Sequence, residues 1–168
     1  MGLGRCTPEE VADYIEACLV SGSASSTCND FASNHPTCKS CLTAANPSGN
    51  ADGALPPILN EVTSPLINIW TCEALVRGLP YCAKPNTDFH FCLHSACPCS
   101  DPEHWNCYEL ATESSACGSF GQYAPSECTP FRTLTELGDL SPECVAGATD
   151  PTWRDAVAGV ANVICGAP

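Results

Sequence analysis

The chain is poor in positive charge. Its 168 residues include 6 Lys and Arg against 19 Asp and Glu, which gives a formal net charge of −13 at pH 7. Phosphate backbones and anionic lipid surfaces are bound through clusters of basic side chains, which this composition does not supply. We therefore expect no nucleic-acid partner and no attraction to anionic membranes.

Long apolar runs and large aliphatic side chains are also scarce. No stretch approaches the roughly 18 apolar residues that cross a bilayer, so we expect no membrane span. Leu, Ile, Val and Phe together supply 31 of the 168 residues. Such a low share, combined with a large net charge, is typical of disordered chains. A folded state therefore needs stabilisation beyond an aliphatic core.

Cysteine is the residue that the chain has in excess. Six consecutive cysteine pairs are ten residues apart: Cys18/Cys28, Cys28/Cys38, Cys72/Cys82, Cys82/Cys92, Cys97/Cys107 and Cys107/Cys117. A disulfide that closes a segment of this length contributes roughly 3 kcal/mol. We therefore predict a disulfide framework in place of a large core. Its candidates are all fifteen cysteines: Cys6, Cys18, Cys28, Cys38, Cys41, Cys72, Cys82, Cys92, Cys97, Cys99, Cys107, Cys117, Cys128, Cys144 and Cys165.

Dense disulfides indicate an oxidising compartment, so we expect an exported protein, either secreted or at the cell surface. Met1 is followed by Gly-Leu-Gly-Arg-Cys without the apolar core of a signal peptide. We expect the native signal peptide to have been removed or to lie outside this sequence.

Prolines mark the expected starts of helices. A Ser, Thr or Asp before Pro is typical of a helix N-cap followed by the first helical position. Six pairs fit: Thr7-Pro8, Ser64-Pro65, Asp101-Pro102, Thr129-Pro130, Ser141-Pro142 and Asp150-Pro151. Thr7 with Glu10, and Ser100 with Glu103, also fit a capping box.

Apolar periodicity supports the same helices. One helical stripe comprises Val11, Tyr14, Ile15, Cys18 and Leu19, and another comprises Trp153, Val157, Val160 and Ile164 before a terminating Gly166. Further helices are expected between Asp101 and Gly118 and at about 27–34, 38–45, 66–77, 88–97 and 130–137. The fold class is therefore predicted as all-α, a disulfide-stapled bundle of short helices with helical hairpins and long loops.

Cysteine-free residues 42–71 suggest a division of the chain. We predict an N-terminal cysteine-linked helical hairpin (1–45), a loop or linker (46–65) and a larger helical disulfide-rich lobe (66–168), with one continuous domain as the alternative. In the hairpin, matching rises from the turn predict an inner Cys18–Cys28 bridge and an outer Cys6–Cys41 bridge. Cys38 is then expected to reach the second lobe.

Fifteen is an odd number, so at least one cysteine has no partner within the chain. It is either a buried thiol or the point at which the chain bonds to a second copy or another protein. We therefore keep self-assembly, or a protein partner held through an unpaired cysteine, as an expectation.

Chemical motifs are few. His90 and His94 are four residues apart, share a helical face and form the alternative metal site, with Cys97 or Cys99 as further ligands. Oxidised cysteines are the competing interpretation, and we predict no metal and no cofactor. Cys38-Lys-Ser-Cys41 is a CxxC motif, which we interpret as structural. No catalytic constellation is present, so no catalytic residue is assigned and an enzyme ranks behind binding roles.

The cysteine layout over nearly the whole chain resembles that of cysteine-rich exported proteins of myxobacteria. The features that carry the resemblance are Cys-Thr-Pro-Glu-Glu at 6–10, Cys38-x-x-Cys41, Cys92-x4-Cys97-x-Cys99 and the terminal Ile-Cys-Gly at 164–166. The resemblance implies export and a shared framework, and it implies no activity.

These observations predict an exported, disulfide-stabilised helical protein with a binding or structural role outside the cytoplasm. One alternative is a small-ligand carrier for lipid-like or sterol-like molecules. Its weakness is that few aliphatic side chains remain to line a cavity. The other alternative is a metal-binding protein that uses His90 and His94. The three tryptophans, Trp70, Trp105 and Trp153, are expected in the core.

Overall fold

A computed structural model describes residues 4–43, 57–59, 66–96, 117, 127–128 and 139–166. For residues 59, 66, 91 and 94–96 it describes the backbone alone. The described chain is mostly helical and held by disulfides, as predicted. Its order is α1 (Pro8–Tyr14), η1 (Ile15–Val20), α2 (Ser26–Asn34), α3 (Pro36–Leu42), β1 (Ile58–Leu59), β2 (Leu66–Ile67), α4 (Ile69–Val76), η2 (Pro80–Cys82), α5 (Ala83–Ala96), η5 (Pro142–Val145) and α8 (Trp153–Cys165).

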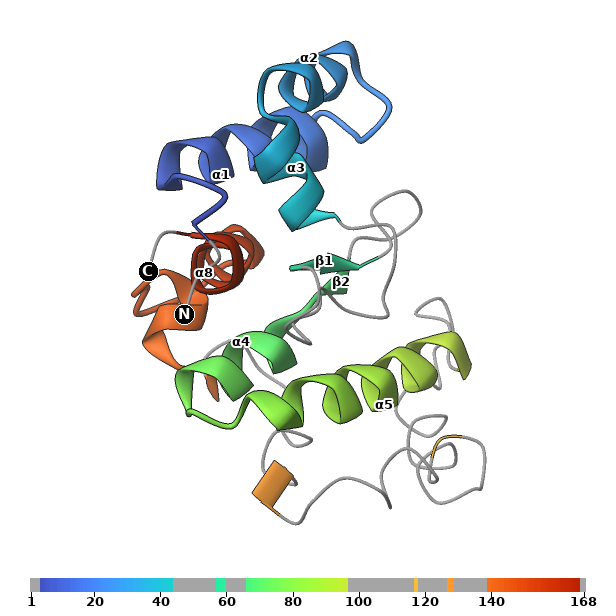
Figure 1. Ribbon diagram of the computed structural model, residues 1–168, viewed down its shortest axis with the longest axis vertical. Helices are drawn as coiled ribbons and strands as arrows, with labels where there is room; N and C mark the ends of the chain where they lie inside the picture. Colours follow the sequence, from blue (N-terminus) through green and yellow to red (C-terminus); the bar gives the residue numbers. More distant parts are fainter. Residues whose placement is uncertain are drawn as a thin grey trace.

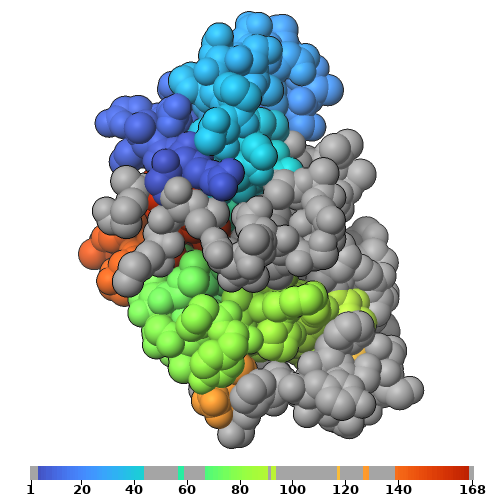
Figure 2. Space-filling view, viewed as in Figure 1, coloured from blue at the N-terminus to red at the C-terminus, as the bar shows by residue number. Residues whose placement is uncertain are grey.

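Helix α8 lies in the middle of the arrangement (Figure 1). Helices α1, α2 and α3 lie on one side of it, and α4 and α5 lie on the other. The space-filling view shows the same order along the molecule, with residues 4–43 at one end and α4 and α5 farther down (Figure 2). Helix α8 therefore packs against the N-terminal helices α1 and α3 and against the central helix α4.

Local sequence explains the two best-defined helix starts. The Thr7 hydroxyl accepts a hydrogen bond from the Glu10 N–H, and the Glu10 carboxylate accepts one from the Thr7 N–H. Thr152 and Asp155 make the same reciprocal pair at the start of α8. Each box satisfies two N–H groups that a helix start leaves open. The predicted Thr7 cap is therefore confirmed, whereas the cap of α8 is Thr152 and not Asp150.

The first helix ends in a wider turn. Residues Ile15–Val20 form a π-helix, in which the Ser21 N–H donates to the Glu16 carbonyl. At the end of this π-helix, the Ala17 carbonyl accepts hydrogen bonds from two side chains, the hydroxyls of Ser25 (3.0 Å) and Thr27 (3.2 Å). These bonds fold α2 back against the end of η1, close to the Cys18–Cys28 disulfide.

The expected helix start at Ser64 and the expected burial of Trp153 are both wrong. Leu66 and Ile67 pair with Leu59 and Ile58 in a short antiparallel ladder, so no helix starts at Ser64. The helix expected at about 66–77 is present as α4, which begins at Ile69, where the Asn68 side chain caps it. Trp153 is 45% exposed, with the Arg154 guanidinium 5.6 Å from its ring centre.

Some of the remaining helix predictions fall on described residues and can be checked, and others fall outside them. Helices α2, α3 and α5 confirm those expected near 27–34, 38–45 and 88–97, although α5 starts at Ala83. Trp70 is buried as expected. The predicted helices at 101–118 and 130–137, the starts at Asp101 and Thr129, the Ser100–Glu103 box and Trp105 lie outside the described residues, apart from the helical Cys117.

One hydrophobic cluster joins the two predicted lobes. Its buried members come from α1, η1, α2, α3, β1, η5 and α8, with Cys72 of α4. Eight of these members are half-cystines, namely Cys6, Cys18, Cys28, Cys38, Cys41, Cys72, Cys144 and Cys165. β1 falls within the segment predicted as a linker. Sulfur therefore fills much of the interior that aliphatic side chains would otherwise occupy.

A buried carboxylate fixes the segment before α8. Glu73 is fully buried and accepts hydrogen bonds from the Ser141 N–H (2.5 Å), the Ser141 hydroxyl (2.9 Å) and Nε of Arg77 (2.9 Å). A buried carboxylate needs such partners to offset its desolvation. Ser141 therefore bonds to α4 and makes no side-chain cap for η5, a short 3₁₀ helix at the predicted Ser141-Pro142 start.

Among the described residues, no helix is long and apolar enough to cross a membrane.

Gly159 provides a test of the packing between α8 and η5. A Cβ at Gly159 would lie 2.3 Å from the Cys144 carbonyl carbon and 2.6 Å from the Ala146 nitrogen, both backbone atoms. Helix propensity alone predicts that Gly159→Ala stabilises the protein by about 1 kcal/mol. Because the backbone must move, we instead expect a loss of about 2 kcal/mol, measured by calorimetric unfolding. Stabilisation by this substitution would contradict the packing.

Candidate functional site

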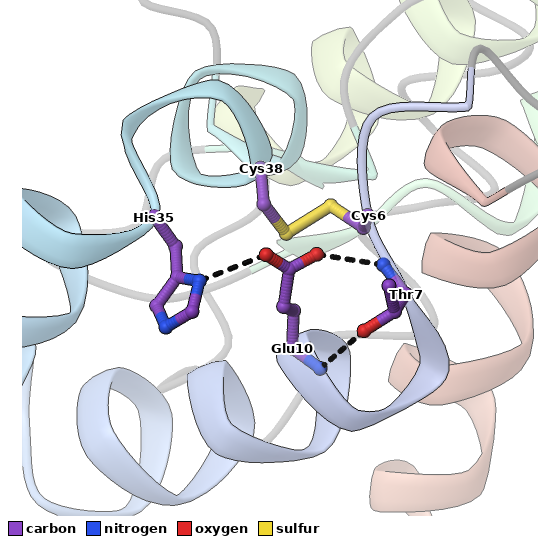
Figure 3. A network of polar contacts seen from close by, with 5 residues as sticks. All are labelled: Cys6, Thr7, Glu10, His35 and Cys38. Carbon is purple, nitrogen blue, oxygen red and sulfur yellow. Dashed lines mark hydrogen bonds and ion pairs between the residues drawn. A yellow bond between two sulfur atoms is a disulfide. The ribbon is translucent and has the colours of Figure 1, made fainter.

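A partly exposed carboxylate–imidazole pair is formed by Glu10 of α1 and His35 between α2 and α3. Oε1 of Glu10 lies 2.8 Å from Nδ1 of His35, and Oε2 accepts a hydrogen bond of 2.7 Å from the Thr7 N–H. Figure 3 shows these groups together with the Cys6–Cys38 disulfide, whose Cys6 directly precedes Thr7 in the chain. The site therefore combines a carboxylate, an imidazole and a cystine.

Local structure places each group. Thr7 caps α1, which puts Glu10 in its first turn. His35 separates α2 from α3, because Pro36 opens the next helix and disfavours a helical conformation in the residue before it. The same break turns α3 so that Cys38, in its first turn, bonds to Cys6. The pair thus lies where the hairpin closes on itself.

Hydrogen bonding lowers the pKa of the Glu10 carboxyl below its ordinary value. The main cause is the backbone N–H of Thr7, and the hydrogen bond with His35 acts in the same direction. Both contacts favour the ionised carboxylate. Glu10 is therefore a charged acceptor that orients the imidazole, as an acid residue does in many general-base pairs.

Aromatic contacts hold the imidazole from the other side. The His35 ring stacks on Phe31 at 5.0 Å between centroids, and Phe31 packs against Tyr14 at 5.6 Å. Nζ of Lys39 lies 4.9 Å from the centre of the Tyr14 ring. Because Phe31 and Tyr14 are buried, they fix the orientation of a ring whose side chain is 34% exposed.

The arrangement can hold and transfer a proton at the imidazole. Nucleophilic catalysis also needs a reactive group beside the base. The thiols of Cys6 and Cys38 are bonded to each other, so neither is a nucleophile while the disulfide is intact. The sequence indicated Glu10 only as a capping residue and gave no indication of His35, because 25 residues separate the two.

The disulfide pairing corrects one prediction and confirms another. Cys18–Cys28 is present as expected. The Cys6–Cys41 bridge is wrong, because Cys6 bonds to Cys38 and Cys41 bonds to Cys165. The break at His35 places the first turn of α3 opposite Cys6 and directs its last turn towards α8. Cys41, and not Cys38, therefore connects to the C-terminal part.

The other described disulfides are Cys72–Cys144, Cys82–Cys128 and Cys92–Cys117. All twelve described cysteines are thus paired with one another. The remaining three, Cys97, Cys99 and Cys107, lie outside the described residues. Because three is odd, at least one of them has no partner within the chain.

Of the two histidines predicted as the alternative metal site, the structure describes the side chain of His90 alone. His90 is buried on α5, and its ring stacks on Trp70 at 4.0 Å between centroids. The side chain of His94 lies outside the described residues, as do Cys97 and Cys99. No group of three His, Cys, Asp or Glu side chains within the described parts could hold a metal ion. The His90 and His94 pair stays a prediction.

Comparison with known proteins gives no family for this chain. No protein-family model, curated protein or solved structure matches it.

Glu10 makes the stability of the hairpin depend on pH. A lowered pKa stabilises the folded state above about pH 4.5, and this contribution is lost as acid protonates the folded carboxyl. We expect Glu10→Gln to reduce the free energy of unfolding at pH 7 by about 0.5–1 kcal/mol. The difference from the unmodified protein should shrink towards zero as the pH falls through the lowered folded-state pKa of Glu10.

Calorimetric unfolding over a pH series measures this difference. Glu9→Gln is the matched control, because Glu9 is exposed in the same turn of α1. It removes the same charge without touching His35, so its effect should stay small at every pH. An effect of Glu10→Gln that is constant with pH would contradict the assigned role of the carboxylate.

Proposed function

We propose that this chain is an exported protein in which oxidised cysteines hold a helical scaffold for binding or structural assembly outside the cytoplasm. One observation carries the proposal, namely that all twelve described cysteines are paired in disulfides. Cytosolic thiols are kept reduced, whereas exported proteins keep their disulfides.

The position of the disulfides supports a permanent rather than a transient oxidation. Cys18, Cys38, Cys72, Cys82, Cys117, Cys128, Cys144 and Cys165 are each at most 1% exposed. Their sulfur atoms belong to the packed interior, so reduction would leave buried thiols and release the constraints between distant segments. An oxidising compartment is the environment in which this interior persists.

A binding or structural role accounts for the features of the surface better than catalysis does. Among the described residues, the partly exposed Glu10–His35 pair has no reactive thiol beside it, because all twelve described cysteines are in disulfides. The acidic composition favours partners that carry positive charge, and the odd cysteine among Cys97, Cys99 and Cys107 offers a covalent link to a second copy or another protein. Membership of the myxobacterial group of cysteine-rich exported proteins is part of the same proposal.

Thiol labelling of protein from its native source tests the compartment. We expect the chain in the extracellular or envelope fraction, and no labelling of the twelve paired cysteines by N-ethylmaleimide in urea without reductant. Any label that does appear should be confined to the tryptic peptide 78–132, which contains Cys97, Cys99 and Cys107. Label on Cys41 or Cys165 in protein blocked at the moment of lysis would contradict the proposal.

Electrophoresis without reductant tests covalent assembly. A bridge to a second copy gives a species of twice the 17.6 kDa chain mass, which collapses to the single chain on reduction. Three single variants, with serine in place of Cys97, Cys99 or Cys107, identify the cysteine that forms the bridge. One of these variants should lack the larger species, and the other two serve as its controls. A single-chain species carrying a free, titratable thiol would overturn the covalent link while leaving the export proposal standing.

A further inference from the structure

Four cysteines from three segments meet where α3, residues 4–6 and the end of α8 come together. Cys38 and Cys41 lie on α3, where they form the CxxC motif. Cys6 immediately precedes the capping residue of α1, and Cys165 is the last residue of α8. The structure joins them as Cys6–Cys38 and Cys41–Cys165. The CxxC motif is therefore divided between two disulfides.

The backbone also brings the alternative pairs close to the Cα separations of disulfides. Cys38 and Cys41 are three residues apart in one helix, which puts their Cα atoms about 5 Å apart. The Cys6 N–H donates to the Cys165 carbonyl at 3.0 Å, so standard backbone dimensions hold their Cα atoms within about 7 Å. Bridged cysteines have Cα separations of about 4.4–6.8 Å. The two observed bonds span 4.8 and 6.0 Å.

We propose that these four cysteines form a thiol–disulfide exchange site with two connectivities. In the first, which the structure shows, α3 is bonded to Cys6 and to Cys165. In the second, the CxxC motif closes on itself as Cys38–Cys41, and Cys6 bonds to Cys165. The co-reactant is a low-molecular-weight thiol acting as its thiolate, and the exchange regenerates it.

Each step forms one S–S bond and breaks one. The external thiolate attacks Cys6, forms a mixed disulfide and releases the Cys38 thiolate. The Cys38 thiolate attacks Cys41, forms Cys38–Cys41 and releases the Cys165 thiolate. The Cys165 thiolate then attacks Cys6 in the mixed disulfide, forms Cys6–Cys165 and returns the external thiolate. No net oxidation or reduction occurs, so no oxidant is required.

Cys6 is the point of entry. It is 4% exposed, the largest value among the four cysteines. The segment that carries it is held to α8 by backbone hydrogen bonds from Gly4 to Gly166 and from Arg5 and Cys6 to Cys165. A segment held by so few bonds opens at lower cost than a packed helix. In the proposed exchange, opening of this segment gives the external thiolate access to the Cys6 sulfur, and the later steps are intramolecular.

Exchange changes which segments are covalently linked. In the first connectivity, α3 is tied to α8 through Cys41–Cys165, and the hairpin is closed through Cys6–Cys38. In the second, α3 loses its bonds to α8 and to Cys6, and Cys18–Cys28 is the one described disulfide that still ties α2 and α3 to the rest of the chain. Figure 1 shows these two helices at one end of the molecule, where their release would leave α8 in contact with α4.

Tryptic mapping without reductant distinguishes the two connectivities, because Lys39 separates Cys38 from Cys41. In the first connectivity, peptide 6–39 holds both Cys6–Cys38 and Cys18–Cys28 internally and is released as a separate peptide. In the second, the same peptide is bonded to 40–77 through Cys38–Cys41 and to 155–168 through Cys6–Cys165. A change in mass of this one species therefore reports the exchange.

The experiment uses the full chain, with free thiols blocked by N-ethylmaleimide and excess reagent removed. The protein is then treated with substoichiometric 2-mercaptoethanol at mildly alkaline pH and quenched with acid before digestion. We expect on the order of a tenth of peptide 6–39 to become bonded to 40–77 and 155–168. Without thiol, the peptide should stay separate.

The double variant Cys41→Ser/Cys165→Ser is the matched control, because it removes the disulfide that the Cys38 thiolate attacks. Its peptide 6–39 should stay separate at every thiol concentration. The proposal is overturned if peptide 6–39 of the unmodified chain stays separate at all thiol concentrations that leave Cys18–Cys28 closed. It is equally overturned if links through Cys18 or Cys28 appear as fast as those through Cys38, since that result indicates general scrambling.

Discussion

Covalent links between distant segments are the constraint on which the remaining structure depends. Cys41–Cys165 joins residues 124 positions apart, and Cys72–Cys144 joins residues 72 positions apart. Both bonds hold the region of α8 and η5 against earlier parts of the chain. Cross-links of this span remove many conformations from the unfolded chain, which offsets the small amount of aliphatic surface available for burial.

The packing around α8 follows from these links. Because Cys144 is bonded to α4, the backbone of η5 is held against Gly159 at a distance that leaves no room for a Cβ. Glu73 reinforces the same junction by accepting both hydrogen bonds of Ser141. The half-cystines then act twice, as cross-links and as the apolar groups that fill the interior.

The sequence predicted the local features and missed the tertiary ones. The Thr7 cap, the stripe along α1 and η1 and the Cys18–Cys28 bridge depend on residues close in the chain, and each was predictable from spacing. The partners of Cys6 and Cys41 depend on where α8 lies, which no local pattern encodes. Ser141 has a capping sequence, but its hydroxyl bonds to Glu73, and Asn68 caps α4 in place of Ser64. Glu10 and His35 meet only because the hairpin closes.

Disulfides substitute for an aliphatic core in this protein. Thermal unfolding followed by circular dichroism, with and without tris(2-carboxyethyl)phosphine, tests this claim most directly, because the reductant adds no group to the sulfur atoms. We expect the fully reduced chain to lose most of its helical signal and its cooperative transition. A reduced chain that keeps its helical signal and unfolds cooperatively near the same temperature would contradict the claim.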